Sequence, residues 1–314
     1  MTVQSEAELI RVAFVGAFSG PDPNTSIEMY RGVEVFLSQG DHSRRFQITK
    51  FDNKGSVEAT IFLMNEIHQE GYKYVVGLAR SDEAIAAAKF ARDKDMIFIT
   101  PFATNPKLRE LGPNIFQVCF DDNFQGEKLA EYTNSKIRPK RVAVLVNSSS
   151  VYSTSLAESF RKGLSASKSV EIITYSENDL DTKKIAQLVY NLKVDLVFIP
   201  DHITRAALLA KDISKRSKNV MFLGGDGFGG QKIFMRLFSD TSDLDVTYST
   251  HWHSDIKNKT NTRFKRDYRL LFQSADPTSG AALTFDAMNA LAQSVHLNLS
   301  IAQVVKNLRD GRLE

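Results

Sequence analysis

The sequence has few features that would support disulfide bonds, membrane insertion or binding through bulk charge. Cys119 is the only cysteine among 314 residues, so no internal disulfide can form, and in the mostly apolar run 115–120 we expect it to be buried rather than a nucleophile. No apolar run reaches the roughly 20 residues that a membrane-spanning helix needs. The net charge of +3 is small, and basic and acidic residues are interspersed, which argues against a nucleic-acid partner.

The N-terminal residues also lack the basic-then-apolar pattern of a secretory signal. Two possibilities remain: a cytoplasmic protein, or an exported protein whose signal lies outside this sequence. We expect trimming at both ends, since Leu313-Glu314 are typical of a cloning remnant. The length suits two domains, and 42% hydrophobic and 25% charged residues are ordinary for a globular protein.

Predicted strands and helices alternate along the chain without a break. Short apolar runs such as 96–100, which ends before Pro101, predict strands buried on both faces, and the Ala-rich segment 81–94 predicts a helix. Ser56 and Asp122 are the expected N-caps of helices 57–69 and 122–135. Repeated strand–helix units indicate parallel sheets with right-handed crossovers.

The spacing of the strands is alike in the two halves of the sequence. We therefore expect an α/β protein of two doubly wound parallel-sheet lobes joined by a hinge. The N-terminal lobe is predicted to comprise residues 1–120 plus 251–314, and the C-terminal lobe residues 121–250.

Polar side chains follow most of the predicted strands, at the sheet edge where open α/β folds bind ligands. In order along the chain they are Ser19, Ser81, Thr104, Tyr152, Asp201, His202 and Asp226. Ser81 precedes the Ala-rich helix, where a hydroxyl and the first helix N–H groups suit a carboxylate, and Asp226 offers a countercharge for an ammonium. If the two lobes face each other, these groups predict a receptor for a small zwitterion.

Each of these residues also has an ordinary structural interpretation. Ser81 could be a simple helix cap, Thr104 a turn hydroxyl and Tyr152 a packed aromatic residue. Asp226 lies in a Gly-rich loop, where aspartate commonly stabilises turns. Their joint placement at strand ends is what favours a binding site.

Several segments resemble the leucine/isoleucine/valine-binding proteins, which are type I periplasmic solute receptors of ABC transporters. The similar segments are Ile10-Arg-Val-Ala-Phe-Val-Gly-Ala-Phe-Ser-Gly-Pro21, Phe46–Asp52, Tyr72–Gly77, Ile99–Thr104, Pro139–Val144 and Phe222–Gly227. The resemblance implies the Venus-flytrap fold, a periplasmic or extracellular location, and an amino acid or small carboxylate as ligand. In that family the chain continues some tens of residues past the position of Gly311.

The resemblance also implies roles for particular residues. Ser81 would bind the ligand carboxylate, and the loop Phe102-Ala103-Thr104 would grip both carboxylate and ammonium through the Phe102 carbonyl and the Thr104 hydroxyl and N–H. Tyr152 would close from the second lobe, and Asp226 would pair with the ammonium, where the family uses a longer Glu. Thr25 falls in a loosely matching segment that the family uses to contact the ligand side chain.

Some residues depart from the family pattern. Arg80 and Asp82 flank Ser81, where small uncharged residues are usual, and they could bind a charged ligand group or pair with each other. Asp201 and His202 lie near the expected aromatic lining of the side-chain pocket. Because an apolar pocket rejects unpaired charge, a polar or charged amino acid or a small acid is at least as good a candidate as leucine.

We therefore expect an extracytoplasmic receptor that presents its ligand to an ABC permease, as a monomer or weak dimer; the alternative is a ligand-sensing domain of a signalling system with the same fold. We expect no enzyme, cofactor or metal, because no nucleophile–base–acid set or metal-ligand spacing is evident. His251-Trp252-His253 favours a hinge strand over a metal site. Gly225, Gly227 and Gly230 match the dinucleotide fingerprint formally, but the charge of Asp226 would repel a pyrophosphate.

Overall fold

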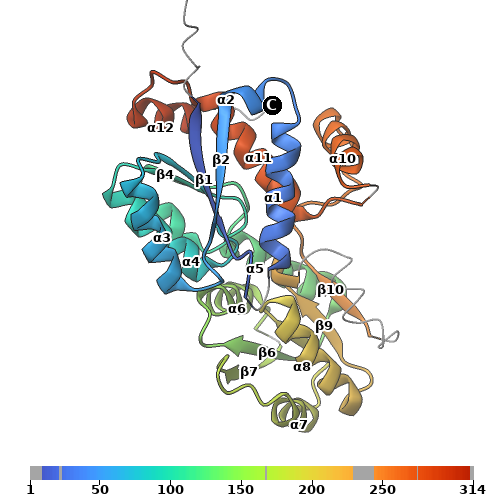
Figure 1. The fold of residues 1–314 in the computed structure, drawn as a ribbon. Helices are drawn as coiled ribbons and strands as arrows, with labels where there is room; N and C mark the ends of the chain where they lie inside the picture. The colour runs from blue at the N-terminus through green and yellow to red at the C-terminus, as the bar shows by residue number, and fades with distance from the viewer. Residues whose placement is uncertain (1–8, 21–22, 167, 229–243, 274, 312–314) are drawn as a thin grey trace, which may run out of the picture. The chain divides into compact units, whose positions relative to one another are not determined.

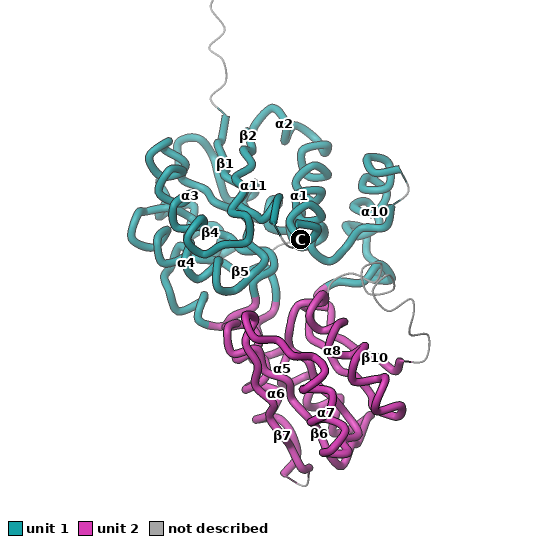
Figure 2. Tube along the Cα trace, turned by 60° about the horizontal axis from the view of Figure 1, so that its bottom comes forward, with its two compact units in different colours: residues 1–103, 107–119, 252–314 teal, residues 104–106, 120–251 magenta. Residues whose placement is uncertain are grey.

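Two compact α/β units make up the chain in a computed structural model, which describes residues 9–20, 23–166, 168–228, 244–273 and 275–311. Unit 1 comprises Met1–Ala103, Lys107–Cys119 and Trp252–Glu314, and unit 2 comprises Thr104–Pro106 and Phe120–His251 (Figure 2). Relative to the predicted lobes, Phe120, His251 and the segment Thr104–Pro106 group with unit 2. Each unit contains a five-stranded sheet in which every pair is parallel, which confirms the predicted fold class.

The sheet of unit 1 has the strand order β2-β1-β3-β4-β5. Its strands are β1 (Ile10–Gly16), β2 (Phe46–Asp52), β3 (Tyr74–Gly77), β4 (Ile97–Thr100) and β5 (Ile115–Gln117). Its helices are α1 (Asn24–Leu37), α2 (His42–Arg45), α3 (Val57–Gln69), α4 (Ser81–Asp93), α10 (Lys259–Leu271), α11 (Ser279–Ser294) and α12 (Ile301–Asp310). The order of strands reverses between β1 and β3, so the switch point of this sheet lies there.

Alternation along β1 divides the core of unit 1 into two layers. Val12 and Phe14 belong to a buried cluster with residues of α1 and α11, whereas Ala13 and Val15 belong to a second cluster with residues of α3 and α4. Because successive side chains of a strand point to opposite faces, helices must cover both faces of this sheet. Figure 1 shows α1 and α11 on one side of β1 and β2, and α3 and α4 on the other.

Unit 2 repeats the arrangement with the strand order β10-β9-β8-β6-β7. Its strands are β6 (Arg141–Asn147), β7 (Ser169–Tyr175), β8 (Leu196–Ile199), β9 (Met221–Gly224) and β10 (Val246–Tyr248). Its longer helices are α5 (Asp122–Tyr132), α6 (Val151–Gly163), α7 (Thr182–Leu192) and α8 (Ile203–Arg216). Val142 and Val144 of β6 pack in a cluster with α5 and α6, and Ala143 and Leu145 pack in a cluster with α7 and α8.

Two helix starts test the predicted caps. The Ser56 side chain accepts a hydrogen bond from the Ala59 N–H, which confirms Ser56 as the cap of α3. The prediction for α5 is wrong by one residue: Asp121 accepts from the Phe124 N–H, and Asp122 is the first helical residue with a fully buried side chain. A cap side chain must fold back over the first turn at the surface, and here Asp121 does so.

Only the first part of the apolar run 115–120 forms a strand. β5 ends at Gln117, and the Val118 N–H bonds to the Thr100 carbonyl before the chain leaves the sheet. Cys119 is buried, as expected, and its sulfur lies 3.3 Å from the Ala103 carbonyl oxygen. Other predicted boundaries differ from the structure by a few residues, which is the usual scatter of element ends.

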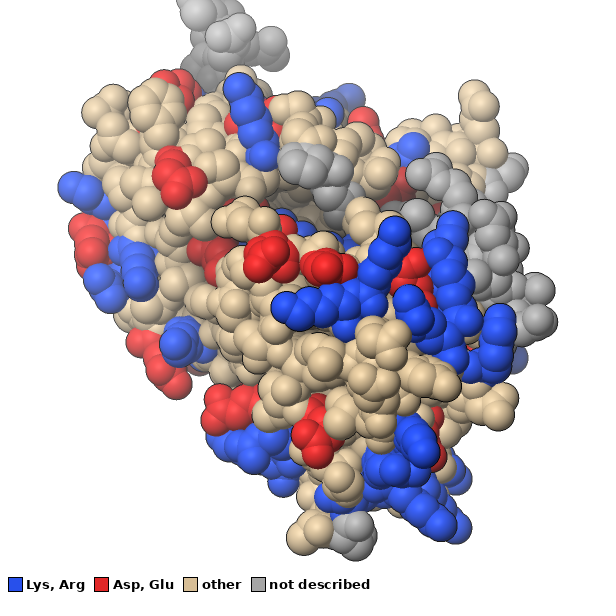
Figure 3. Space-filling model, turned by 90° about the horizontal axis from the view of Figure 1, so that it is seen from below, with Lys and Arg blue, Asp and Glu red and all other residues tan. Residues whose placement is uncertain are grey.

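The described part of the chain contains no helix with the length and apolar content that crossing a bilayer requires. Side chains of both signs share the face of the molecule in Figure 3, in agreement with the interspersed charges of the sequence.

α1 packs so closely against α11 at Gly32 that a side chain there should destabilise the protein. A Cβ at this position would lie 2.2 Å from the Ala281 carbonyl oxygen, so Gly32→Ala must push the two helices apart. We expect a loss of about 1–3 kcal/mol in the free energy of unfolding, or about 2–4 °C in melting temperature for each kcal/mol, measured by thermal denaturation. Exposed Glu34 on the same helix is the matched position, and Glu34→Ala should leave stability within about 0.5 kcal/mol. Equal melting temperatures for the two variants would contradict the packing argument.

Candidate functional site

In unit 1 the loop after β3 is shaped by an unusual backbone at Gly77 and Leu78. Gly77 has φ +135°, and a Cβ there would lie 2.1 Å from the Val15 carbonyl oxygen. Leu78 follows with φ 62°, and its N–H donates to the same oxygen at 2.9 Å. Only glycine fits the first position, and the strained second position is fixed by burial. This turn takes the chain out of the sheet and starts α4 at Ser81.

The amino terminus of α4 is not capped by the side chain of its N-cap residue. The N-cap residue is Arg80, which makes no side-chain cap hydrogen bond, and Ser81 is the first helical residue with 2% exposure. The first-turn N–H groups and the positive end of the helix dipole therefore form a ready anion site. Ser81 lies where the sequence predicts a carboxylate-binding serine.

Charged residues surround this helix start. The Arg80 Nε lies 3.6 Å from Glu83 Oε1, and Asn53 donates to Glu83 Oε2 at 2.9 Å. Burial raises the pKa of Glu83 above its usual value, although Asn53 and Arg80 oppose the shift. Asp82, the other predicted flanking residue, is half-buried in the same turn.

The predicted loop Phe102-Ala103 follows β4, the neighbour of β3 in the sheet. The Thr100 hydroxyl donates to the Leu78 carbonyl and accepts from the Ala103 N–H, both at 3.0 Å. The Ala103 carbonyl accepts from Gln117 at 2.9 Å. The structure thus brings Ser81 and this loop to adjacent strand ends, with the backbone groups of Ala103 already bonded inside unit 1.

The remaining candidates of unit 1 lie beside β1. The Ser19 hydroxyl donates to Asp52 Oδ2 at 2.6 Å, so it holds the loops after β1 and β2 together. Thr25 is half-buried near the start of α1. Asp22 of the same predicted segment lies outside the described residues.

In unit 2, Asp226 lies two residues after the end of β9 and is 6% exposed. Its Oδ1 accepts from Gln125 Nε2 at 2.6 Å and from the Tyr152 hydroxyl at 3.0 Å, and its Oδ2 lies 3.1 Å from His251 Nε2. Burial alone would raise the pKa of Asp226, but His251, Gln125 and Tyr152 hold it below its usual value. Asp226 is therefore an ionised, internally compensated carboxylate.

Tyr152, at the second position of α6, is 3% exposed and shares its hydroxyl between two partners. The hydroxyl donates to Asp226 and accepts from the Gly227 N–H at 3.0 Å. Burial and the nearby carboxylates raise the pKa of Tyr152 well above its usual value, so the phenol stays protonated. The ring of half-exposed His202 stacks on that of Tyr152, with centroids 5.4 Å apart and planes 27° apart.

Asp201 lies in a buried ion pair, a different role from the predicted ligand contact. Arg205 donates to both of its oxygens at 2.8 Å, and Tyr175 and Asn147 donate to Oδ2 at 2.6 and 3.2 Å. The side chain is fully buried, and these donors hold its pKa below the usual value against the effect of burial. Asp201 therefore fastens α8 to β6 and β7, and we leave it out of the proposed ligand contacts.

Thr104 was expected in the first lobe but groups with unit 2 and is buried beside Asp122. Its carbonyl accepts from the Asp122 N–H at 2.9 Å. Burial raises the pKa of Asp122 to about 8; the charge of Asp226 adds to the rise, and the hydroxyls of Thr104 and Ser155 oppose it. Asp122 is therefore neutral at pH 7. It lies three residues before Gln125, which donates to the ionised Asp226.

Sequence reasoning missed Gln125, Asp122 and the site role of His251. Gln125 stands one turn after Asp122 on the buried face of α5, and a polar residue among buried helix positions is the signal that could have found it. His251 was assigned to a hinge strand; β10 ends at Tyr248, and the His251 side chain is 2% exposed against Asp226. No local pattern in the sequence marks that contact.

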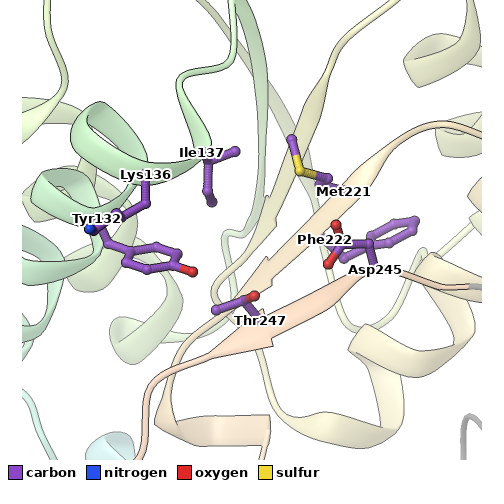
Figure 4. A pocket seen from close by; sticks show the side chains of 7 residues that line it. All are labelled: Tyr132, Lys136, Ile137, Met221, Phe222, Asp245 and Thr247. Carbon is purple, nitrogen blue, oxygen red and sulfur yellow. The ribbon is translucent and has the colours of Figure 1, made fainter.

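A separate cavity of about 240 Å³ lies on the opposite edge of the unit 2 sheet (Figure 4). It is lined by Tyr132, Lys136, Ile137, Met221, Phe222, Asp245 and Thr247. Because Met221 opens β9 and Asp245 precedes β10, this cavity is at the amino-terminal edge, away from Asp226. Among the described residues, no three His, Cys, Asp or Glu side chains are grouped to hold a metal ion. Gly230 of the formal nucleotide fingerprint lies outside the described residues.

Two all-parallel α/β units with polar groups at their carboxyl edges define a two-lobed binding protein. The chain belongs to the periplasmic binding protein family, whose model matches residues 9–312. This confirms the resemblance noted in the sequence, and members of the family are substrate-binding proteins rather than enzymes.

Curated relatives are Leu/Ile/Val-binding proteins. The protein from Escherichia coli K12 is 26% identical over 98% of this chain and 85% of its own length. BraC3 from Rhizobium johnstonii is 24% identical over 72% of this chain, and the matched region spans 63% of that relative.

Solved structures share the fold at lower identity. The leucine-binding protein LivK of Thermotoga maritima has a TM-score of 0.89 at 18% identity, covering 96% of this chain and 87% of its own. LivJ of Streptococcus pneumoniae, in complex with isoleucine, has a TM-score of 0.85 at 21% identity, covering 96% and 88%. A solute-binding protein of R. palustris in complex with benzoate has a TM-score of 0.82 at 19% identity, covering 96% and 85%.

The buried acid Asp122 gives unit 2 a pH-dependent stability. Because its pKa is raised from 3.8 to about 8 in the fold, the folded protein keeps a proton that the unfolded chain loses, and stability falls as the pH rises through this window. Asp122→Asn removes this titrating group. As the pH rises, the free energy of unfolding of the variant, relative to that of the unsubstituted protein, should therefore increase by up to about 1.4 kcal/mol per pH unit. Thermal denaturation between about pH 5 and pH 8 measures this trend.

Asp121→Asn is the matched control, since asparagine also caps a helix and Asp121 is partly exposed. A stability difference for Asp122→Asn that stays constant with pH would contradict a neutral, buried Asp122.

Proposed function

We propose that this protein is an extracytoplasmic receptor that binds a small organic carboxylate, amino acids included, between its two units and presents it to an ABC permease. The observation that carries the proposal is the amino terminus of α4, where the Ser81 hydroxyl and the positive end of the helix dipole are suited to a carboxylate. Membership of the periplasmic binding protein family supports the location and the transport role.

The ligands of relatives support a carboxylate as the shared chemical group. Curated relatives are named for leucine, isoleucine and valine, and two structural neighbours are complexes with isoleucine and with benzoate. All of these ligands carry a carboxylate, but benzoate carries no ammonium. An anion site at α4 would serve both kinds of ligand.

In the proposed mechanism the ligand links the two units. Ser81 and the Phe102-Ala103 loop hold the carboxylate from unit 1, while Thr104 and the network of Tyr152, His202 and Asp226 contact the rest of the ligand from unit 2. A ligand that touches both units favours the closed arrangement by its extra affinity for that state. Moving such an equilibrium from about 1:99 to 99:1 takes roughly 5.5 kcal/mol, the size of a few charge-assisted hydrogen bonds.

A thermal-shift panel of amino acids and small carboxylates tests the proposed function. A compound that binds only the folded protein raises its melting temperature, and the rise grows with concentration above the dissociation constant. We expect at least one carboxylate to do so, whereas the corresponding amides, which lack the carboxylate charge, do not. A panel in which no carboxylate raises the melting temperature would overturn the proposal.

Ser81→Ala tests the proposed anion contact. Loss of a hydrogen bond to a charged group should weaken binding of the carboxylate found in the panel by about 10- to 100-fold in calorimetry. Ser81 is not the capping residue of α4, so little change in melting temperature is expected.

Ser56→Ala provides the opposite control within the same unit. Ser56 caps α3, so its removal should cost about 1 kcal/mol of stability and leave affinity unchanged. If Ser81→Ala binds the carboxylate as tightly as the unsubstituted protein, the proposed contact between Ser81 and the ligand carboxylate is wrong.

A further inference from the structure

Donors from its own unit occupy most of the acceptor positions of the Asp226 carboxylate. A carboxylate has roughly four acceptor positions, and Gln125, Tyr152 and His251 occupy three of them on a side chain that is 4% exposed. The Asp226 backbone N–H also donates to Gln125 Oε1, with 3.4 Å between nitrogen and oxygen. The side-chain amide of Gln125 therefore contacts both the backbone and the side chain of Asp226. Little capacity is left for a further cation.

His251 is the third partner of the Asp226 carboxylate, and its contact reduces the negative charge that a ligand would meet. Its Nε2 approaches the one carboxylate oxygen that Gln125 and Tyr152 leave open. The imidazole is 2% exposed and lies against the ring of Phe120, with centroids 3.8 Å apart. Burial on this side and the aromatic contact hold the donor in place, so it is not a mobile surface pair.

The position of His251 in the chain restricts it further. His251 is the last residue of unit 2, and the next residue, Trp252, donates its indole N–H to Asn261 at 2.9 Å. Phe120, its ring neighbour, is the first residue after the other crossing from unit 1. Both rings therefore belong to residues next to the crossings between the units, and the residue after His251 is held by Asn261.

A ligand ammonium would have to compete with this arrangement. Burying an ammonium costs free energy unless a carboxylate compensates it, and a compensated Asp226 offers only a shared oxygen. A carboxylate ligand without an α-ammonium group avoids that cost and can still use the anion site at α4.

We propose that His251 is a specificity-determining residue: by occupying Asp226 it selects carboxylates that lack an α-ammonium group over the corresponding amino acids. This inference rests on the proposed function and narrows its ligand class. It also gives a role to the short Asp at position 226, whose carboxylate remains inside unit 2 with its three partners.

Matched ligand pairs test the inference on the unsubstituted protein. The pairs are leucine and isocaproate, phenylalanine and hydrocinnamate, and glutamate and glutarate, whose members differ only in the ammonium group. We expect the member without ammonium to bind at least about tenfold tighter by calorimetry in any pair that binds. Tighter binding of the amino acid would overturn the inference and leave the proposed function intact. Binding of no compound overturns both.

His251→Phe tests the residue itself. Phenylalanine keeps the ring against Phe120 but removes the donor, so Asp226 gains an open oxygen and uncompensated charge. We expect the preference within a pair to shift toward the amino acid by about tenfold or more. His251→Gln restores a donor near Asp226 and should return most of the original preference.

His253→Phe is the matched control, because His253 is 57% exposed and pairs with the exposed Asp255. It should leave the preference unchanged. An identical preference in the unsubstituted, His251→Phe and His253→Phe proteins would overturn the role of His251. Because the ligand-pair comparison needs no substitution, a His251→Phe protein that fails to fold does not prevent the test.

Discussion

Within each of the two described sheets all strand pairs are parallel, and the candidate site depends on that constraint. Parallel pairing places the carboxyl ends of β1, β3 and β4 at one edge of the first sheet, and those of β6, β8 and β9 at one edge of the second. The chain must leave each sheet there to enter a helix, so loops and helix starts collect at that edge. Ser81 and Asp226 both owe their positions to this geometry.

The two units use their strand ends in opposite ways. In unit 1 the turn at Gly77 leads to a helix start whose N-cap residue makes no side-chain cap hydrogen bond. In unit 2 the polar side chains bond to one another, and the ionised Asp226 is compensated before any ligand is considered. One unit therefore offers positive dipoles, whereas the other offers a polar but largely satisfied surface.

Much of the fold and part of the candidate site were predictable from the sequence. Apolar runs and their spacing predicted the parallel sheets, because strands buried on both faces need continuous hydrophobic segments. The positions of Ser81, Tyr152 and Asp226 after strands followed from the same pattern. Their partners did not: His251 reaches Asp226 across 25 residues and Gln125 across 101, and no local periodicity encodes such pairs. The hydrogen bond between Tyr175 and Asp201 likewise joins residues 26 apart in the sequence.

Asp122 and Asp226 show how one environment assigns different charges to two buried acids. Asp226 has three donors and stays ionised, whereas Asp122, whose oxygens find no hydrogen bond of ordinary geometry among the described residues, stays neutral. If both were ionised, their repulsion in a buried setting would add to two desolvation costs. Because Asp122 is neutral, Asp226 carries the negative charge of this pair of acids, and His251 contacts it. The charge of Asp226 and its three hydrogen-bond partners therefore connect the packing of unit 2 with the class of ligand that we propose.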